Sequence, residues 1–214
     1  MSNSSLVEYT QLSPHKRSRN GKKISKITIH HAAVVNASLE GLGNGFSKTR
    51  VASANYGIDS KGRIGMFVEE QYRAITSSSA ANDEVAVTIE VANSSAAPDW
   101  KISDAAYKAL INLCVDICKR NNIESLDYTG DKSGNLTRHN MFAATSCPGP
   151  YLQGKFSDIA REVNNRLEVK TAPQVNVLAY GDQGAEVKIL QENLNKLGYN
   201  VGTADGIFGK KTKI

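Results

Sequence analysis

Apolar and polar residues alternate in several short runs in the N-terminal half of the chain, and this alternation predicts β-strands. In the first run, Ser25–His30, Ile27 and Ile29 alternate with polar neighbours. Two further runs, Ala54–Ile58 and Ile64–Val68, flank a glycine-containing segment. This arrangement predicts a β-hairpin.

A run of mostly β-branched residues, Val85–Ala92, has the strongest strand pattern in the chain. A helix is expected next, because Ser103 is a suitable N-cap and apolar residues then recur at helical spacing as far as about Asn122. A final helix is expected from about residue 154 to residue 167. Strands with helices between and after them predict an α/β fold, in which helices flank one central, mainly mixed β-sheet.

Segments without clear periodicity separate these elements. Residues 35–50 are rich in Gly and Asn and are expected to form a loop with at most a short helix near Ser38–Leu42. Residues 77–82 are small and polar, which also favours a loop. Residues 128–150 are expected to form a long polar loop, and long loops inside compact domains usually carry function.

The pattern also predicts a division of the chain into two units. Residues 1–167 are expected to form one domain, residues 168–180 a linker, and residues 181–214 a small, partial helical unit. This second unit contains one amphipathic repeat, which places four apolar residues on one helix face: Val187, Leu190, Leu194 and Leu197.

Composition narrows the possible locations of the protein. No apolar run approaches the roughly 20 residues of a membrane helix, so no membrane span is expected. The N-terminus has no apolar signal-peptide core, which predicts synthesis in the cytoplasm without a signal peptide. The three cysteines are an odd number, which argues against a disulfide framework.

The net charge of +5 includes a basic stretch between Lys16 and Lys26. A solvated loop is one interpretation of this stretch, and attraction to a polyanion is the other. Nucleic acid is not expected as the partner, because no aromatic residues are interleaved and no binding motif follows. The anionic polymers of a bacterial cell wall are a candidate partner.

Three residues suggest a metal site. His30 lies at the end of a predicted strand, His139 lies in the long loop, and Cys147 follows eight positions later. Two imidazoles and a thiolate suit zinc, and a catalytic zinc site keeps its fourth position for water. On these residues alone, surface histidines and a buried cysteine remain the alternative.

Glu90 interrupts the apolar strand pattern of Val85–Ala92. It is either an outward-facing carboxylate or a general base next to the metal site.

Four segments of the chain together resemble the type 2 N-acetylmuramoyl-L-alanine amidase family, which includes phage endolysins, bacterial autolysins and animal peptidoglycan recognition proteins. The segments are Lys26–Ala32, Ser53–Ile64, Ala86–Ala92 and Thr137–Gly149. The likeness is strongest to lysins of clostridia and their phages. It implies hydrolysis of the amide bond between N-acetylmuramic acid and L-alanine in bacterial peptidoglycan, by a phage or prophage lysin or an autolysin acting on the cell wall.

The resemblance also implies roles for individual residues. It implies that Zn²⁺ is bound by His30, the first histidine of the adjacent pair, together with His139 and Cys147. Some phage members carry a catalytic tyrosine where Ala54 stands here, so the chain resembles the branch that uses a glutamate, Glu90. Three further roles are implied: oxyanion stabilisation by Thr145, and substrate contacts by Asn55 and Asn93.

Residues 181–209 resemble the first two thirds of a three-helix peptidoglycan-binding domain, whose third helix is absent after Thr212. Two other functions stay open for the chain as a whole. One is a cysteine peptidase of cell-wall peptides, with Cys147 as nucleophile and His139 as base. The other is a recognition module that binds peptidoglycan without cleaving it.

Overall fold

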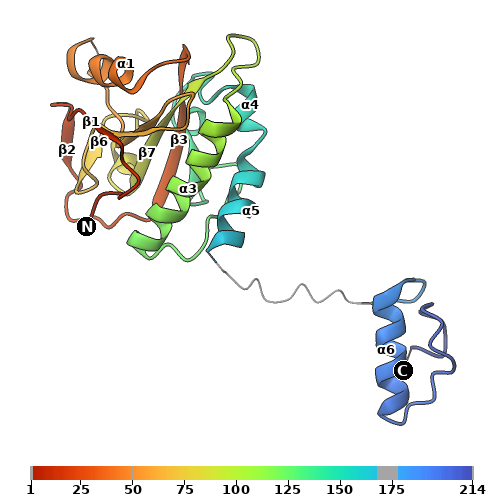
Figure 1. The fold of residues 1–214 in the computed structure, drawn as a ribbon. Coiled ribbons are helices and arrows are strands. Elements are labelled where there is room, and N and C mark those ends of the chain that lie inside the picture. Colours follow the sequence, from red (N-terminus) through yellow and green to blue (C-terminus); the bar gives the residue numbers. More distant parts are fainter. Residues whose placement is uncertain (1, 50, 168–177, 214) are drawn as a thin grey trace. The chain divides into compact units, whose positions relative to one another are not determined.

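A computed structural model describes residues 2–49, 51–167 and 178–213. The chain divides into two compact units, one on each side of residues 168–177 (Figure 1).

The first unit is built on a six-stranded mixed sheet with the strand order β1-β5-β4-β7-β3-β8. Its long central strands, β3 and β7, are parallel, and β4 and β8 run parallel to them on either side. The hairpin strands β4 and β5 are antiparallel, as the sequence predicts. The strands are β1 (Tyr9–Thr10), β3 (Lys26–Val35), β4 (Tyr56–Ile58), β5 (Ile64–Met66), β7 (Ala86–Asn93) and β8 (Leu136–Arg138). A separate antiparallel pair is formed by β2 (Lys16–Ser18) and β6 (Tyr72–Ala74).

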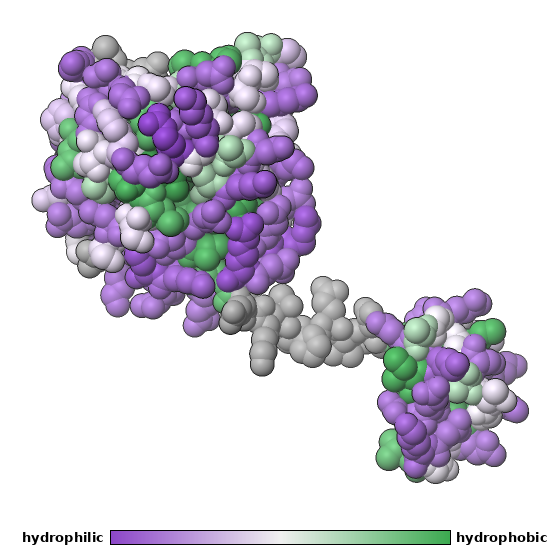
Figure 2. Space-filling model, in the orientation of Figure 1, coloured by the Kyte–Doolittle hydropathy of each residue, from purple (hydrophilic) through white to green (hydrophobic). Residues whose placement is uncertain are grey.

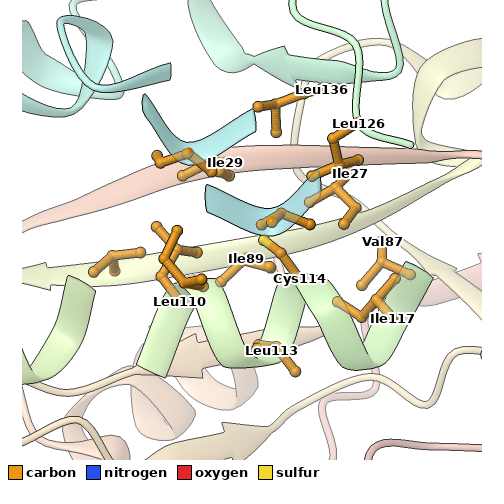
Figure 3. Packing of buried hydrophobic residues seen from close by; sticks show 14 of the residues in the cluster. Ile27, Ile29, Val87, Ile89, Leu110, Leu113, Cys114, Ile117, Leu126 and Leu136 are labelled. Carbon is orange, nitrogen blue, oxygen red and sulfur yellow. The ribbon is translucent and has the colours of Figure 1, made fainter. Parts of the chain in front are cut away.

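The helices α3 (Asp104–Asn121) and α5 (Phe156–Arg166) cover one face of the sheet. Ser103 caps α3 by accepting the N–H of Ala106, and Asn122 ends it with a left-handed φ of 55°. Side chains alternate between the two faces of the sheet along β3 and β7, so every second residue faces α3, and these residues are apolar. Figure 3 shows this core, in which strand residues pack against the apolar stripe of α3: Ile27, Ile29, Val87 and Ile89 against Leu110, Cys114 and Ile117.

The short helix α1 (Leu39–Asn44) and the π-helical turn that follows it (Gly45–Thr49) belong to a second, smaller core. In this core Leu42 and Phe46 of these turns cluster with Phe67. Gly57 of β4 makes the close packing possible, because a Cβ atom there would lie 2.6 Å from the Phe67 ring. Ser38 is the N-cap of α1, which confirms the short helix expected in this region.

Two segments expected to be loops contain regular structure. The segment 128–150 contributes the edge strand β8, the 3₁₀ turn η2 (His139–Met141) and the start of α4 (Gly149–Gln153), and the segment 77–82 contains most of α2 (Ala80–Asp83). Strand β8 has only three residues, so it is too short to show alternation. Its conformation comes from pairing with β3, which the local sequence does not reveal.

The second unit contains α6 (Ala185–Lys196) and an isolated bridge between Gln183 and Ile207. Of the four apolar residues expected on one helix face, Val187 is buried, whereas Leu197 is 74% exposed because it lies beyond the end of the helix. In both units the face shown in Figure 2 is largely hydrophilic, with separate hydrophobic patches. Among the described residues, no helix combines the length and the apolar character needed to span a bilayer.

Candidate functional site

Three potential metal ligands from different parts of the first unit come together at one end of the sheet. The candidate ligand atoms of His30, His139 and Cys147 all lie within 4.8 Å of one another. Cys147 Sγ is 3.7 Å from His30 Nδ1, and the two imidazole ring centroids are 4.6 Å apart. His30 and Cys147 are buried, whereas His139 is half-buried. The Nε2 atoms of both histidines are buried and have no hydrogen-bond partner among the described residues.

The register of the parallel strands explains why Glu90 lies next to this cluster. Glu90 pairs with His30 across β7 and β3, and on its other side it pairs with Gly57 of β4. Ile29 pairs with Arg138 of β8, so the next residue, His139, follows in line with His30. Glu90 and His30 thus come from neighbouring strands, and His139 begins the 3₁₀ turn directly after the next strand, β8, at the same level of the sheet.

The second histidine of the adjacent pair takes a different place. Because side chains alternate along β3, His31 points to the face opposite His30. Its ring packs edge-on against Trp100, with 5.3 Å between the centroids. The backbone N–H of His31 donates a hydrogen bond to Cys147 Sγ over 3.4 Å, so this residue supports the third potential ligand through its main chain.

Burial favours the neutral form of each group in the cluster. It lowers the pKa of His30 well below its ordinary value, and the nearby His139 lowers it further. Burial also lowers the pKa of His139. The thiol pKa of Cys147 is raised by burial and, to a smaller extent, by the negative charge of Glu90. Neutral imidazoles carry the free lone pairs that a metal ion needs.

A cleft of about 340 Å³ opens above the cluster. Glu90, His139, Thr145 and Cys147 line one part of it. A second part of the wall comes from α1 and the turn after it, and includes Leu42 and Phe46. No sequence motif assigns Leu42 and Phe46 to the site, although their spacing of four is a weak helical signal.

The remaining residues that the sequence analysis assigned to the site are placed differently. Thr145 is half-buried and its hydroxyl accepts the N–H of Cys147 over 3.2 Å. Asn55 is fully buried, and its amide donates to the carbonyls of Val68 and Tyr72. Asn55 does not line the cleft, and its contact with substrate stays a prediction.

Asn93 is also fully buried, and its amide donates to the carbonyl of Trp100 over 2.9 Å. It does not line the cleft, and its contact with substrate stays a prediction. The other two cysteines, Cys114 and Cys118, lie in the core on α3, as their helical spacing suggests.

Several basic side chains between residues 16 and 26 form ion pairs or hydrogen bonds within the protein. Lys16 forms an ion pair of 2.8 Å with Glu69. Arg19 is buried, and its guanidinium donates to three backbone carbonyls, those of Glu70, Asp83 and Glu84. Lys26 donates to the carbonyls of residues 132 and 134. Attraction to anionic wall polymers therefore stays a prediction for the remaining cations.

Solved structures with a similar fold include AmpD, an N-acetylmuramoyl-L-alanine amidase and a peptidoglycan recognition protein. AmpD, as a selenomethionine derivative, has 17% sequence identity and a TM-score of 0.56, covering 73% of this chain and 96% of AmpD. The N-acetylmuramoyl-L-alanine amidase LysC from Clostridium intestinale URNW has 19% identity and a TM-score of 0.54, covering 74% and 95%. The Drosophila peptidoglycan recognition protein SA has 15% identity and a TM-score of 0.53, covering 70% and 90%. At these identities the similarity confirms the expected fold.

Comparison with protein families extends the assignment beyond the fold. No curated protein sequence matches the chain. A family model described as "Putative peptidoglycan binding domain" matches residues 183–213 of the second unit. The model of the N-acetylmuramoyl-L-alanine amidases matches residues 20–150, which include all four strands that surround the site and all three potential metal ligands. The chain therefore belongs to the N-acetylmuramoyl-L-alanine amidase family.

Proposed function

We propose that the chain is a zinc-dependent enzyme that hydrolyses the amide bond between N-acetylmuramic acid and L-alanine in bacterial peptidoglycan. Membership of the amidase family supports the reaction. The observation that carries the metal assignment is the convergence of His30, His139 and Cys147 next to the carboxylate of Glu90. The bacterial cell wall is the proposed place of action, by a phage or prophage lysin or an autolysin.

The donor atoms fit a tetrahedral zinc ion. With Zn–N of about 2.0–2.1 Å and Zn–S of about 2.3 Å, tetrahedral geometry separates a nitrogen and a sulfur ligand by about 3.6 Å. The 3.7 Å between His30 Nδ1 and Cys147 Sγ agrees with this value. When bound, zinc supplies a Lewis acid that lowers the pKa of water to roughly 7 and polarises a carbonyl oxygen.

Glu90 is the proposed general base. Its carboxylate lines the cleft next to the ligand cluster and can accept a proton from the attacking water. The same carboxyl group can then donate that proton to the nitrogen of the leaving L-alanine, because the reaction must protonate the amine as the amide bond breaks. The two central strands hold Glu90 in place, which removes the need to order it during the reaction.

Thr145 is proposed to stabilise the negative charge that develops on the carbonyl oxygen. Its hydroxyl accepts the N–H of Cys147, so its own hydrogen stays available for donation into the cleft. The wall that contains Leu42 and Phe46 would exclude water from that side of the bound substrate.

The test is to incubate the full chain with purified peptidoglycan and to identify the products by mass spectrometry, with parallel metal analysis. The proposal requires new amino termini of L-alanine, loss of activity when a chelator removes the metal, and recovery when Zn²⁺ is restored. Cleavage that survives metal removal would instead support the cysteine peptidase. Binding to peptidoglycan without any cleavage would support the recognition module.

We also propose that residues 1–167 form the catalytic domain, residues 168–180 a linker, and residues 181–214 a unit that helps to hold the enzyme on peptidoglycan. The family match of residues 183–213 supports this role for the second unit. Limited proteolysis tests the division, because cleavage should concentrate between residues 168 and 180. Early cleavage inside either unit would contradict it.

A further inference from the structure

A row of three buried threonines lies directly below the proposed catalytic groups. Thr28, Thr88 and Thr137 each stand two residues before a residue of the site, namely His30, Glu90 and His139 respectively. Thr28 pairs in register with Thr88 on one side and with Thr137 on the other. All three threonines are fully buried. Because strand side chains repeat with a period of two, Thr28 shares a sheet face with His30, and Thr88 shares it with Glu90. Thr137, as the register partner of Thr28, lies on the same face, next to the turn that bears His139.

Hydrogen bonds join two of these threonines across β3, which bears His30, and β8, which leads into the turn with His139. Asn82 of α2 donates from Nδ2 to Thr28 Oγ1 over 2.9 Å. Thr28 Oγ1 lies 2.9 Å from Thr137 Oγ1, which in turn lies 3.4 Å from the carbonyl oxygen of Ile27. A consistent direction of donation therefore runs from Asn82 through Thr28 and Thr137 to the backbone of β3.

The third threonine, Thr88 of β7, is held by Asn55, which directly precedes the neighbouring strand β4. Thr88 Oγ1 accepts the N–H of Asn55 over 3.2 Å, and the backbone N–H of Thr88 donates to Asn55 Oδ1 over 3.1 Å. The hydroxyl of Thr76 lies 3.0 Å from Thr88 Oγ1. These contacts also give a structural purpose to the burial of Asn55, which the sequence analysis had placed at the substrate.

Hydrophobic packing alone does not explain this row. Valine has nearly the same shape as threonine and avoids the free-energy cost of burying a hydroxyl group. A fully satisfied polar network instead restricts geometry, because hydrogen bonds are directional whereas apolar contacts tolerate sliding. The opposite sheet face, with Ile27, Ile29 and Ile89, has the apolar character expected of a buried core.

We propose that the threonine row is a positioning layer for the site. In this role Thr28 and Thr137, anchored by Asn82, set the spacing of His30 and His139 for the metal ion. Thr88, held by Asn55, sets the position of Glu90. The inference rests on the proposed function, in that it assigns to these positions the metal ion and the base named there.

The test measures zinc binding by the full chain in two kinds of variant: valine variants, which lack the threonine hydroxyl, and serine variants, which keep a hydroxyl. Thr28→Val and Thr137→Val should each lower zinc affinity about tenfold in competition with a chelator, at the lower end of the effect of groups that orient metal ligands. They should also alter the absorption spectrum of the Co²⁺-substituted protein, which reports ligand geometry. Thr28→Ser and Thr137→Ser keep the hydroxyl and should restore both properties. Asn82→Ala, which changes neither strand, should also weaken zinc binding and serves if a valine variant does not fold.

Thr88→Val should separate the two halves of the layer. It should leave zinc affinity unchanged and lower kcat, with little change in KM, because Thr88 supports only Glu90. Tyr56→Phe is the matched control, since it removes a buried hydroxyl that accepts the Ser4 N–H and donates to Glu70, away from the metal ligands. It should lower the denaturation midpoint without changing zinc affinity.

The outcomes separate this inference from the proposed function. Zinc affinity and a Co²⁺ spectrum unchanged in Thr28→Val and Thr137→Val would overturn the inference, even if the wild-type chain hydrolyses peptidoglycan. Weaker zinc binding in those variants would support the inference, even if the wild-type chain cleaves no amide bond. A wild-type chain that binds no zinc would overturn both.

Discussion

Glu90 and His30 are register partners on the parallel strands β7 and β3, so backbone pairing alone brings the proposed base next to a proposed metal ligand. Both strands lie in the middle of the sheet, where neighbours on either side restrict their movement. A site built on central strands is held more firmly than one built on loops. This relationship separates the role of Glu90 from metal binding and allows each to be tested alone.

Replacing Glu90 with Gln should leave zinc content unchanged, because the ligand set stays intact. The release of L-alanine amino termini should fall by about 10²–10⁴-fold, which is the usual contribution of general acid–base catalysis. Glu84→Gln is a suitable control, because Glu84 lies outside the cleft and contacts Asn20 and Lys22. If Glu90→Gln cleaves peptidoglycan at the wild-type rate, the role assigned to Glu90 is wrong.

Replacing Cys147 with Ser should weaken zinc binding by more than the roughly 10–100-fold typical of residues that only orient a ligand. A serine hydroxyl is a poorer zinc ligand than a thiolate. Metal analysis after dialysis measures the loss, and Cys118→Ala, in the core on α3, should keep its zinc. A Cys147→Ser variant that loses activity but keeps its zinc would favour the cysteine peptidase instead.

The sequence predicts the parts of the fold that rest on strong local patterns. The alternation in β3 and β7 and the capped repeat of α3 are visible in the sequence. The predicted bounds of β7 and α3 agree with the structure to within about one residue, whereas β3 continues past the predicted end at His30 to Val35. Strand β8 was not predicted, because three residues carry too little periodicity to distinguish a strand from a loop. Only the pairing of β8 with β3, distant in sequence, reveals it.

The candidate site also depends on contacts between residues distant in sequence, which local sequence patterns do not reveal. The sequence alone left surface histidines and a buried cysteine as an alternative, and only the resemblance to a family selected His30 over His31. Register and burial, which are properties of the folded chain, bring His30, His139 and Cys147 together. The polar row below them follows a visible pattern, a threonine two residues before each site residue. The meaning of that pattern depends on strand pairing, which the sequence does not show.

Gly57 should not tolerate even a methyl group. A Cβ atom at this position would lie 2.6 Å from the Phe67 ring and 3.0 Å from Leu42, so these side chains would have to move. Gly57→Ala should therefore lower the free energy of unfolding by about 1–3 kcal/mol, the usual cost of overpacking. It should also slow hydrolysis, because Gly57 is the register partner of Glu90 and Leu42 lines the cleft.

Gly154→Ala is the control for this change. Its Cβ atom would meet neighbours only at 3.5 Å or more, which is ordinary contact, and Gly154 lies outside the cleft. Urea denaturation compares the two variants directly. Equal stability of both variants and the wild type would show that the second core accommodates the added methyl group and would contradict the prediction.

The buried carboxylate of Glu70 should be one of the main determinants of stability in the first unit. Glu70 is fully buried and accepts two hydrogen bonds from Arg120, of 2.6 and 2.9 Å. Glu70→Gln removes the fully buried member of the two carboxylates that pair with Arg120, the other being Asp116. Removing one partner of a buried ion pair costs up to about 3–5 kcal/mol. Asp158→Asn, which removes the carboxylate of two exposed pairs with Lys155 and Arg161, should change stability much less. The single tryptophan, Trp100, lies in the first unit. Its fluorescence therefore measures the unfolding of the first unit in urea, without a signal from a tryptophan in the second unit. A loss in Glu70→Gln no larger than that in Asp158→Asn would mean that the tyrosine and asparagine contacts to Glu70, not its charge, hold this cluster together.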